Sequence, residues 1–335
     1  MATAVAPSAP VHPLETLHDM LQGDMAATNE TILARLQSPV ETIPAVAEYL
    51  IASGGKRIRP LLTLACAAMF GERGDRVAKL SAAVEFIHSA TLLHDDVVDG
   101  SEVRRGKTAA NLVYGNQAAV LVGDFLFSRA FELMVETKNL RVLELLSRAA
   151  TVITEGEVLQ LKAAHNLATS MDDYMAVIGA KTAALFAAAA AAGPALAEVS
   201  PDIQDALYQY GHHLGVAFQI ADDVLDYTGN ERDFGKEQGN DFFEGKMTAP
   251  VIFALQFGGA TERAFWQKAL VDRDVTPDDF ERARTYLIQH DAFHKAHELA
   301  ETHKDLACAA LARLPDHPIK PVLAELAVFA VLRQK

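Results

Sequence analysis

Apolar residues in this 335-residue chain recur mostly at intervals of three and four positions, the spacing of a helix with one buried face. Alternation at every second position, which is typical of strands, is nearly absent. The helical pattern is clearest in five stretches, 78–100, 118–136, 142–164, 174–193 and 206–229. Several of them are apolar on almost every side, so we expect them to be central helices of a large bundle. The pattern therefore predicts an all-α fold.

The chain is expected to form one domain, because no Pro-, Gly- and Ser-rich linker is long enough to divide it. Residues 1–14 are rich in Ala, Pro and Ser and lack the basic and apolar regions of a secretory signal, so they predict a flexible tail before a domain of residues 15–335. The longest uncharged apolar run, residues 182–197, is shorter than a bilayer span and is interrupted by Gly193-Pro194. We therefore expect no transmembrane segment.

The charge balance narrows the classes of ligand. The chain has 44 acidic and 30 basic residues and a net charge of −14, which argues against a nucleic-acid-binding protein. A few well-placed cations could still bind an anionic small molecule. Cys66 and Cys308 are far apart and lack metal-ligand spacing, so we expect free, buried thiols in a reducing compartment, the cytoplasm.

Two acidic clusters of the same spacing stand within the apolar pattern. They are "DDVVD", with Asp95, Asp96 and Asp99, and "DDVLD", with Asp222, Asp223 and Asp226. Positions i and i+4 share a helix face, so each cluster projects into a small volume. Two carboxylates roughly 6 Å apart repel by about 2–3 kcal/mol near a protein surface. Divalent cations are the natural counter-charge, and Mg²⁺ commonly bridges carboxylates to phosphates.

Other interpretations of these clusters remain open at this point. A single DDxxD could be no more than a solvated helix end. His94-Asp95 is similar to the dyad of metal phosphohydrolases, although no further His-rich ligand set follows it. An EF-hand calcium loop fits poorly, because the spacing of the acidic residues is helical.

Basic residues accompany the acidic clusters. The segment "SGGKRIRP", residues 53–60, places cations after two glycines that give backbone room beside an anion. It lacks the spacing of a P-loop, and a solvated charged turn is an equally simple interpretation. His88 lies on nearly the same helix face as the first aspartates and could be an ordinary core residue. The candidate cations are Lys56, Arg57, Arg59, Arg104, Arg105, Lys181, Lys236 and Lys246.

Taken together, these motifs resemble those of the trans-isoprenyl diphosphate synthases, or polyprenyl synthetases, over roughly residues 51–250. The resemblance depends on their order and number: "GGKRIRP", "FIHSATLLHDDVVDGSEVRRG", "VGDFL", "GAKTAALF", "FQIADDVLDY" and "GKEQGNDFFEGKMTAP". It implies a single bundle of antiparallel helices around a deep central cavity, the isoprenoid synthase fold. It also implies a prenyltransferase that works as a homodimer and depends on Mg²⁺, with three ions per active site when substrate is bound.

The resemblance assigns roles to individual residues. It places the six aspartates on the metal ions that hold the diphosphate of an allylic substrate. It implies that Arg104, supported by Lys181, Lys236 and Lys246, contacts that diphosphate. It implies an isopentenyl diphosphate pocket formed by Lys56, Arg57, Arg59, His88 and Arg105, and it places Thr182 and Gln219 near the reacting carbons.

The chemistry of such an enzyme agrees with these residue types. An allylic diphosphate ionises when its leaving group is neutralised, and the resulting cation must be shielded from water by apolar walls and closing loops. Residues 228–250, rich in Gly and charge, are the expected moving cover. No side chain is an obvious general base, and in the family the released diphosphate is thought to take the proton.

Product length is expected to follow from the depth of the cavity below Asp95. In short-chain members a bulky aromatic residue stands four or five positions before the first motif, where this chain has Thr91 and Ala90. Thr91 lies one turn from Asp95 on the same face, whereas the role of Ala90 is implied by the resemblance alone. By this analogy we expect a product of about eight to ten isoprene units, as used in a ubiquinone side chain. The aromatic and Met residues of the next helix could form the floor of the cavity or ordinary core: Phe125, Phe127, Phe131 and Met134.

Three alternative functions stay open. The first is a shorter-chain farnesyl or geranylgeranyl diphosphate synthase. The second is a class I terpene cyclase, which would generally lack the second aspartate cluster and the second diphosphate pocket. The third is a non-catalytic subunit of a heteromeric synthase, which would usually lose an aspartate cluster. Beyond its diphosphate substrates and a second copy of itself, we expect only peripheral membrane contact for product release.

Overall fold

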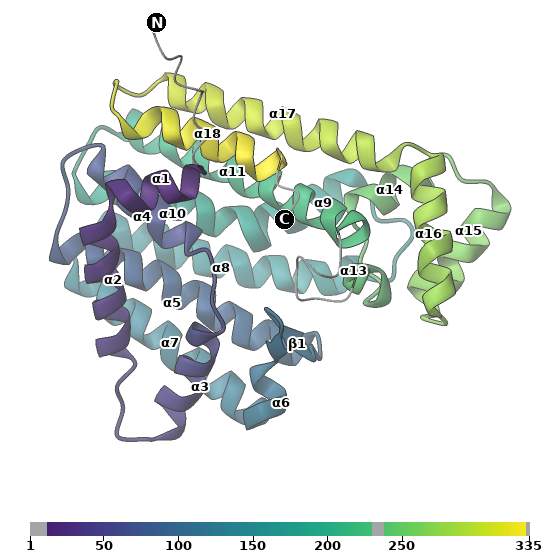
Figure 1. Ribbon diagram of the computed structural model, residues 1–335, viewed down its shortest axis with the longest axis horizontal. Coiled ribbons are helices and arrows are strands. Elements are labelled where there is room, and N and C mark those ends of the chain that lie inside the picture. The colour runs from purple at the N-terminus through teal and green to yellow at the C-terminus, as the bar shows by residue number, and fades with distance from the viewer. Residues whose placement is uncertain (1–11, 230–237, 333–335) are drawn as a thin grey trace, which may run out of the picture.

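The protein is described here by a computed structural model that covers residues 12–229 and 238–332 (Figure 1). It is almost entirely helical, as the apolar periodicity predicts. The elements are α1 (Pro13–Met20), α2 (Gln22–Arg35), α3 (Thr42–Ala52), α4 (Ile58–Ala68), α5 (Asp75–Val98), β1 (Val103–Arg104), β2 (Lys107–Thr108), α6 (Ala110–Tyr114), α7 (Asn116–Glu136), α8 (Leu140–Ala163), α9 (Met171–Ile178), the π-helix η1 (Gly179–Ala183), α10 (Ala184–Leu196), α11 (Pro201–Thr228), α13 (Asn240–Phe243), α14 (Ala249–Leu255), α15 (Ala260–Trp266), the π-helix η2 (Gln267–Val271), α16 (Pro277–Gln289), α17 (Ala292–Ala312) and α18 (Ile319–Leu332).

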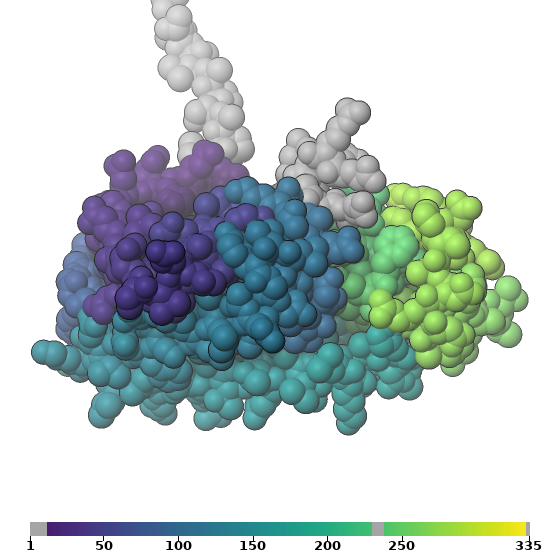
Figure 2. Space-filling view, turned by 90° about the horizontal axis from the view of Figure 1, so that it is seen from below, coloured from purple at the N-terminus to yellow at the C-terminus, as the bar shows by residue number. Residues whose placement is uncertain are grey.

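Helix α10 is the centre of the bundle. All of its residues are buried, and it packs against α4, α8 and α11. Its run of alanines lets the neighbouring backbones come close. A Cβ added at Gly211 of α11 would lie only 2.4 Å from the carbonyl oxygen of Phe186, so glycine is required at this crossing. The N-terminal helices lie at one end of the molecule and α15–α16 at the other (Figures 1 and 2).

Some details differ from the sequence-based expectations. Pro194 does not interrupt the helix: α10 runs through Gly193-Pro194 to Leu196, so the loss of one backbone N–H donor in its last turn is tolerated. Residues 13 and 14, expected in the tail, begin α1, and Leu14 is buried. Cys66 is buried as expected, whereas Cys308 is only partly buried.

One continuous helical stretch, Met171–Leu196, has the length and apolar composition to cross a membrane. This differs from the expectation of no transmembrane segment, which considered only the uncharged run of residues 182–197. Of its most apolar window, 67% is buried inside the fold. Core helices of this kind are as apolar as membrane spans, and here the apolar surface is covered by other helices.

A short hairpin follows the first aspartate cluster and was not expected from the sequence. Val103 pairs with Thr108 and Arg104 with Lys107 in antiparallel register. The turn residues Arg105 and Gly106 have φ angles of 53° and 73°, as in a type I′ turn. The hairpin thereby turns the two consecutive arginines back toward the end of α5.

The close crossing of α10 and α11 generates a prediction about stability. Gly211→Ala should lower the free energy of unfolding by about 1–3 kcal/mol, because the new methyl group cannot be accommodated without moving a backbone. Gly23→Ala on α2 is the matched control, since a Cβ there meets nothing within 4 Å, and it should be neutral or slightly stabilising. Thermal and denaturant unfolding measure both variants. Equal stability of the two would contradict this packing.

Candidate active site

The first aspartate cluster lies at the C-terminal end of α5. Asp95 and Asp96 belong to the last turns of the helix and Asp99 is its C-cap. The three carboxylates are not equivalent: the side chain of Asp96 is fully buried, whereas Asp95 and Asp99 are partly exposed. Two carboxylates of the cluster therefore face the site, and the middle one faces the protein.

Arg104 binds the buried middle carboxylate. Its Nε and Nη2 donate to Asp96 Oδ1 at 2.8 and 2.5 Å, and the side chain of Asn111 donates to the Asp96 carbonyl oxygen at 3.0 Å. These contacts attach the hairpin to the end of α5. Arg104, predicted as a substrate contact, is thus engaged with Asp96, so at least part of its role is to position the first cluster.

The second cluster, on α11, repeats this arrangement with different partners. Asp223 is buried, and its two oxygens accept hydrogen bonds from Tyr174 Oη at 2.7 Å and from Gln219 Nε2 at 2.8 Å. Asp222 is exposed, and Asp226 accepts a hydrogen bond from the backbone N–H of Asp241 at 3.0 Å. Again the first and last carboxylates of the motif are the outward-facing ones.

Two lysines lie between the clusters. Lys181, in the π-helix η1, places Nζ 2.8 Å from Glu157 Oε2 and 3.7 Å from Asp95 Oδ2. Lys246 pairs with Glu244 and lies 3.4 Å from Asp241 Oδ1. Burial acts to lower the pKa of Lys246, but Asp241 and Glu244, with Asp99 adding, outweigh it and leave the pKa raised. Lys246 therefore stays charged and offsets part of the repulsion between the carboxylates around it.

A cavity of about 110 Å³ opens beside these groups. Its walls include Lys181, Thr182, Gln219 and Asp223, together with apolar side chains of α8 and α9. Burial raises the pKa of Asp95 to about 6; Lys181 opposes this rise, and Glu157 and Asp99 add to it. Burial, together with Asp241, also raises the pKa of Asp223 well above its ordinary value. The site is thus acidic and partly shielded from water.

A separate cationic pocket is formed by the start of α4, the middle of α5 and the hairpin turn. Arg57 Nη1 lies 3.0 Å from Oε1 of the buried Glu85. Arg59 Nη1 lies 3.3 Å from His88 Nε2, and its guanidinium stacks 4.4 Å from the ring centre of Phe186. Because Arg59 can only donate, His88 Nε2 is the acceptor of this hydrogen bond.

The cationic pocket has more positive than negative charge. Burial lowers the pKa of Arg59 to about 10. Burial also holds the pKa of His88 well below its ordinary value, and the positive charges of Arg59 and Arg105 add to this effect. Burial also raises the pKa of Glu85, while the surrounding arginines act to lower it. One buried carboxylate therefore faces several arginines, which is the charge balance of a site for a multivalent anion.

The hydrogen bonding of this pocket is incomplete in the described part of the chain. Arg59 Nε is buried and has no hydrogen-bond acceptor there, and Arg57 Nη1 has only its 3.0 Å ion pair with Glu85. Arg105 donates to the Gly54 carbonyl oxygen, and a Cβ at Gly55 would lie 2.8 Å from the Arg105 guanidinium. The glycine pair thus makes room for an arginine. A phosphate oxygen would accept a hydrogen bond from the unpaired Arg59 Nε–H.

The carboxylates suit a particular kind of metal binding. Within residues 12–229 and 238–332, no three His, Cys, Asp or Glu side chains already form a metal cage. The donors present are oxygens on two helices with lysines between them. This fits a hard cation such as Mg²⁺, which keeps several waters and bridges one or two carboxylates to substrate phosphates.

Several sequence-based assignments are resolved by these contacts. His94 does not form a catalytic dyad with Asp95. Its Nε2 lies 3.2 Å from the Val120 carbonyl oxygen, so the side chain connects α5 to α7. Phe131 is exposed, so it is not a cavity floor within this chain. Lys236 and the middle of the expected cover, residues 230–237, lie outside the described residues.

Four acidic or phenolic residues of the site escaped the sequence analysis: Glu85, Glu157, Tyr174 and Asp241. Glu85 lies in the predicted helix of residues 78–100, three residues before His88, and Glu157 follows a glycine in an apolar helix, so each was a charge within an apolar pattern. Asp241 lies within a quoted motif. Nothing in the sequence pattern distinguished Tyr174, because a tyrosine at helical spacing is usually an ordinary core residue.

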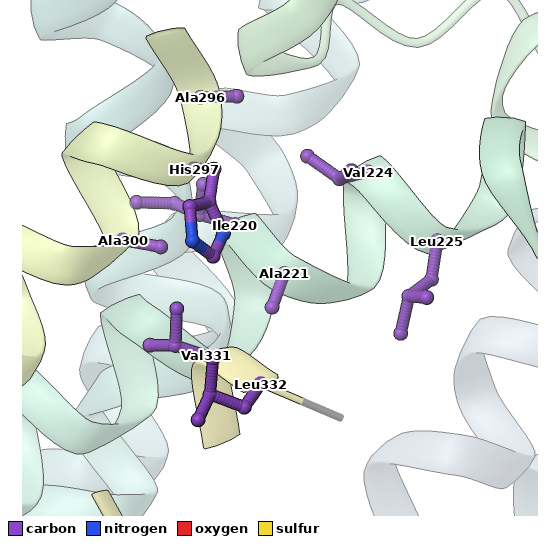
Figure 3. Close-up of a pocket in the computed structure, with 9 residues that line it drawn as sticks. All are labelled: Ile220, Ala221, Val224, Leu225, Ala296, His297, Ala300, Val331 and Leu332. Carbon is purple, nitrogen blue, oxygen red and sulfur yellow. The ribbon is translucent and has the colours of Figure 1, made fainter. Parts of the chain in front are cut away.

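A larger, mostly apolar pocket of about 230 Å³ lies elsewhere, between α11, α17 and α18 (Figure 3). It is lined by Ile220 and Val224 of α11, Ala296 and His297 of α17, and Val331. It lies next to the second cluster along α11, but none of the acidic side chains lines it. Of these two pockets, only the smaller one is lined by acidic side chains and lysines.

Comparison with known proteins agrees with this geometry. Residues 40–287 match the model of the polyprenyl synthetase family. The octaprenyl diphosphate synthase of Escherichia coli (strain K12) is 41% identical over 322 residues, 96% of this chain and 99% of that protein.

Solved structures give the same result. A polyprenyl synthase from Caulobacter crescentus CB15, complexed with calcium and isoprenyl diphosphate, matches with a TM-score of 0.93 and 52% identity, covering 96% of this chain and 98% of that chain. A decaprenyl diphosphate synthase from Rhodobacter capsulatus matches with a TM-score of 0.92 and 48% identity, covering 96% and 100%. The chain therefore belongs to the polyprenyl synthetase family, as a divalent-metal-dependent prenyltransferase of the long-chain type.

Proposed function

We propose that this prenyltransferase condenses isopentenyl diphosphate onto an allylic diphosphate such as geranyl or farnesyl diphosphate, to give a product of eight to ten isoprene units. The observation that carries the proposal is the presence of two separate diphosphate-binding environments. One has outward-facing aspartates with lysines between them, and the other is a partly buried group of arginines in which Arg59 Nε has no hydrogen-bond acceptor within the described residues. A terpene cyclase needs only the first environment. The length of the product is supported by the octaprenyl and decaprenyl synthases to which the chain is similar.

The metal is proposed to be Mg²⁺, with three ions in the substrate-bound enzyme. Asp95 and Asp99 of the first cluster, and Asp222 and Asp226 of the second, are the carboxylates in position to hold them. Asp96 and Asp223, also predicted as ligands, are engaged by Arg104 and by Tyr174 with Gln219. When bound, the ions supply the positive charge that neutralises the departing diphosphate.

The side chains of the protein divide the remaining work. Lys181 and Lys246 can donate N–H groups to the allylic diphosphate, because both lie beside the acidic clusters. Arg57, Arg59 and Arg105, with Lys56 at the rim, can hold the diphosphate of isopentenyl diphosphate through bidentate contacts. Apolar walls then keep water from the allylic cation.

Condensation forms a carbon–carbon bond between C1 of the allylic substrate and the isopentenyl double bond, and a proton is then lost. His88 is poorly suited as the base, because its Nε2 already accepts a hydrogen bond from Arg59. We assign the proton to the released diphosphate, which leaves from beside the reacting carbons. Thr182 and Gln219 line the cavity where these carbons would lie.

The product is proposed to serve as the side chain of a quinone such as ubiquinone. We place the enzyme in the cytoplasm, with peripheral membrane contact when the product is released. The small residues before the first cluster are consistent with a long product: Thr91 is on the Asp95 face of α5, whereas Ala90 is fully buried and faces the core.

A homodimer is proposed from the exposed apolar surface of α7. Leu121, Phe131 and Val135 are 67%, 41% and 62% exposed and recur at helical spacing along one face. Leu112 and Val113 of α6 are also exposed, at 58% and 47%. Large apolar side chains exposed together on one helix face are a feature of protein–protein interfaces.

The first prediction from the proposed function concerns the product. Purified protein incubated with farnesyl diphosphate, labelled isopentenyl diphosphate and Mg²⁺ should give chains of about eight to ten units, because long-chain relatives share its motifs. Chelation of the metal should abolish turnover, and added Mg²⁺ should restore it. A single farnesyl- or geranylgeranyl-sized product would reject the proposed length.

The second prediction concerns the path of the growing chain. Thr91→Tyr should shorten the product by several isoprene units, because the ring would occupy the face of α5 directly below Asp95. Product sizing by chromatography measures this. Thr285→Tyr is the control: Thr285 also donates its hydroxyl within its own helix, but it lies on exposed α16 and should leave the length unchanged. An unchanged length in Thr91→Tyr would place the channel elsewhere.

The third prediction concerns assembly. Light scattering should give about twice the 36.2 kDa mass of one chain for the wild type. Leu121→Arg combined with Val135→Arg should shift it to the mass of a single chain, because a charge cannot be buried unpaired in an apolar interface. Ile288→Arg, at the equally exposed Ile288 of α16, should remain dimeric. A double variant that stays dimeric would exclude this face.

A further inference from the structure

We propose that Tyr174 is a positioning residue of the active site: through Asp223 and Gln219 it fixes the π-helix that carries Lys181. The inference rests on the proposed function. Tyr174 lies on α9, ahead of the π-helix, and its hydroxyl donates to Asp223 Oδ2 at 2.7 Å. Both side chains are 4% exposed, so this hydrogen bond is shielded from water.

The hydrogen bond from Tyr174 is the first of a continuous chain of three. Gln219 Nε2 donates to the other oxygen of Asp223 at 2.8 Å, and Thr182 Oγ1 donates to Gln219 Oε1 at 2.8 Å. Each donor meets an acceptor, so the orientation of the Gln219 amide is determined by its two neighbours. Asp223 is the junction, since both of its oxygens are occupied.

One end of the chain of hydrogen bonds lies before the π-helix turn and the other lies within it. Tyr174 precedes η1, Thr182 lies within it, and both are connected to α11. A π-helical turn is rare and tends to occur at functional sites, where neighbouring contacts must hold it. This turn places Lys181 Nζ 2.8 Å from Glu157 and 3.7 Å from Asp95. The hydrogen-bond chain thereby determines where the lysine stands between the two acidic clusters.

The hydroxyl of Tyr174, and not only its ring, is required in this arrangement. Asp223 is buried close to Asp241 and Asp222, whose negative charges disfavour the ionised form of the Asp223 carboxyl group. Without the phenol donor, one Asp223 oxygen would face these carboxylates unpaired. The carboxylate would then turn to another donor, and Gln219 and Thr182 would lose their common anchor.

The test is Tyr174→Phe, which removes only the hydroxyl. We expect kcat to fall by about 10–100-fold and the Mg²⁺ concentration for half-maximal rate to rise, as for other residues that support a metal site indirectly. The KM for isopentenyl diphosphate should change little, because the arginine pocket is untouched. Tyr210→Phe is the matched control: Tyr210 is a buried tyrosine on α11 whose hydroxyl donates to the Leu323 carbonyl oxygen. It should lower Tm without changing kcat or the Mg²⁺ dependence.

Asp223→Asn provides a second, independent variant. Like Tyr174→Phe, it should lower kcat and raise the Mg²⁺ concentration for half-maximal rate. The kcat of the double variant should equal that of Asp223→Asn alone, because both substitutions act through Asp223. Wild-type kcat and Mg²⁺ dependence in either single variant would overturn the inference, as would additive losses. Should Tyr174→Phe fail to fold, Asp223→Asn alone decides. A wild-type protein with no turnover would instead refute the proposed function.

Discussion

Repulsion between carboxylates held close together inside an apolar bundle is the constraint on which this site depends. The protein meets it in the same way twice. The middle aspartate of each cluster is buried and accepts hydrogen bonds from neighbouring side chains, Arg104 for Asp96 and Tyr174 with Gln219 for Asp223. The outer carboxylates are more exposed, so lysines and substrate-bound cations can offset their charge. The inward aspartate thus orients the outward ones.

The surrounding fold provides the rigidity that this arrangement needs. The alanine-rich helix α10 packs tightly against its neighbours, so α11 and the π-helix that leads into α10 have little freedom to separate. A hydrogen-bond chain is effective only between elements whose spacing is constant within a fraction of an ångström. Close packing and the polar network therefore depend on each other.

Acidic and basic groups are separated along α5. Its C-terminal end presents aspartates, whereas its middle contributes Glu85 and His88 to the arginine pocket. A metal-bound diphosphate and a second, metal-free diphosphate could therefore lie on the same helix without competing for partners. This separation is the structural basis for a condensation between two diphosphates, and it agrees with the family to which the chain belongs.

The sequence by itself determined the helical class, the clusters and most of the cations, because helical periodicity and short-range spacing are local properties. The tertiary structure alone decided which aspartate of each cluster faces inward, since that depends on Arg104 and Tyr174, which lie 8 and 49 positions from their partners. Glu85 and Glu157 likewise gained meaning only from Arg57 and Lys181, cations that are distant from them in the sequence. The hairpin and the π-helix are stabilised by contacts with other elements, so periodicity could not reveal them. A local pattern specifies which groups are available, and packing specifies which of them meet.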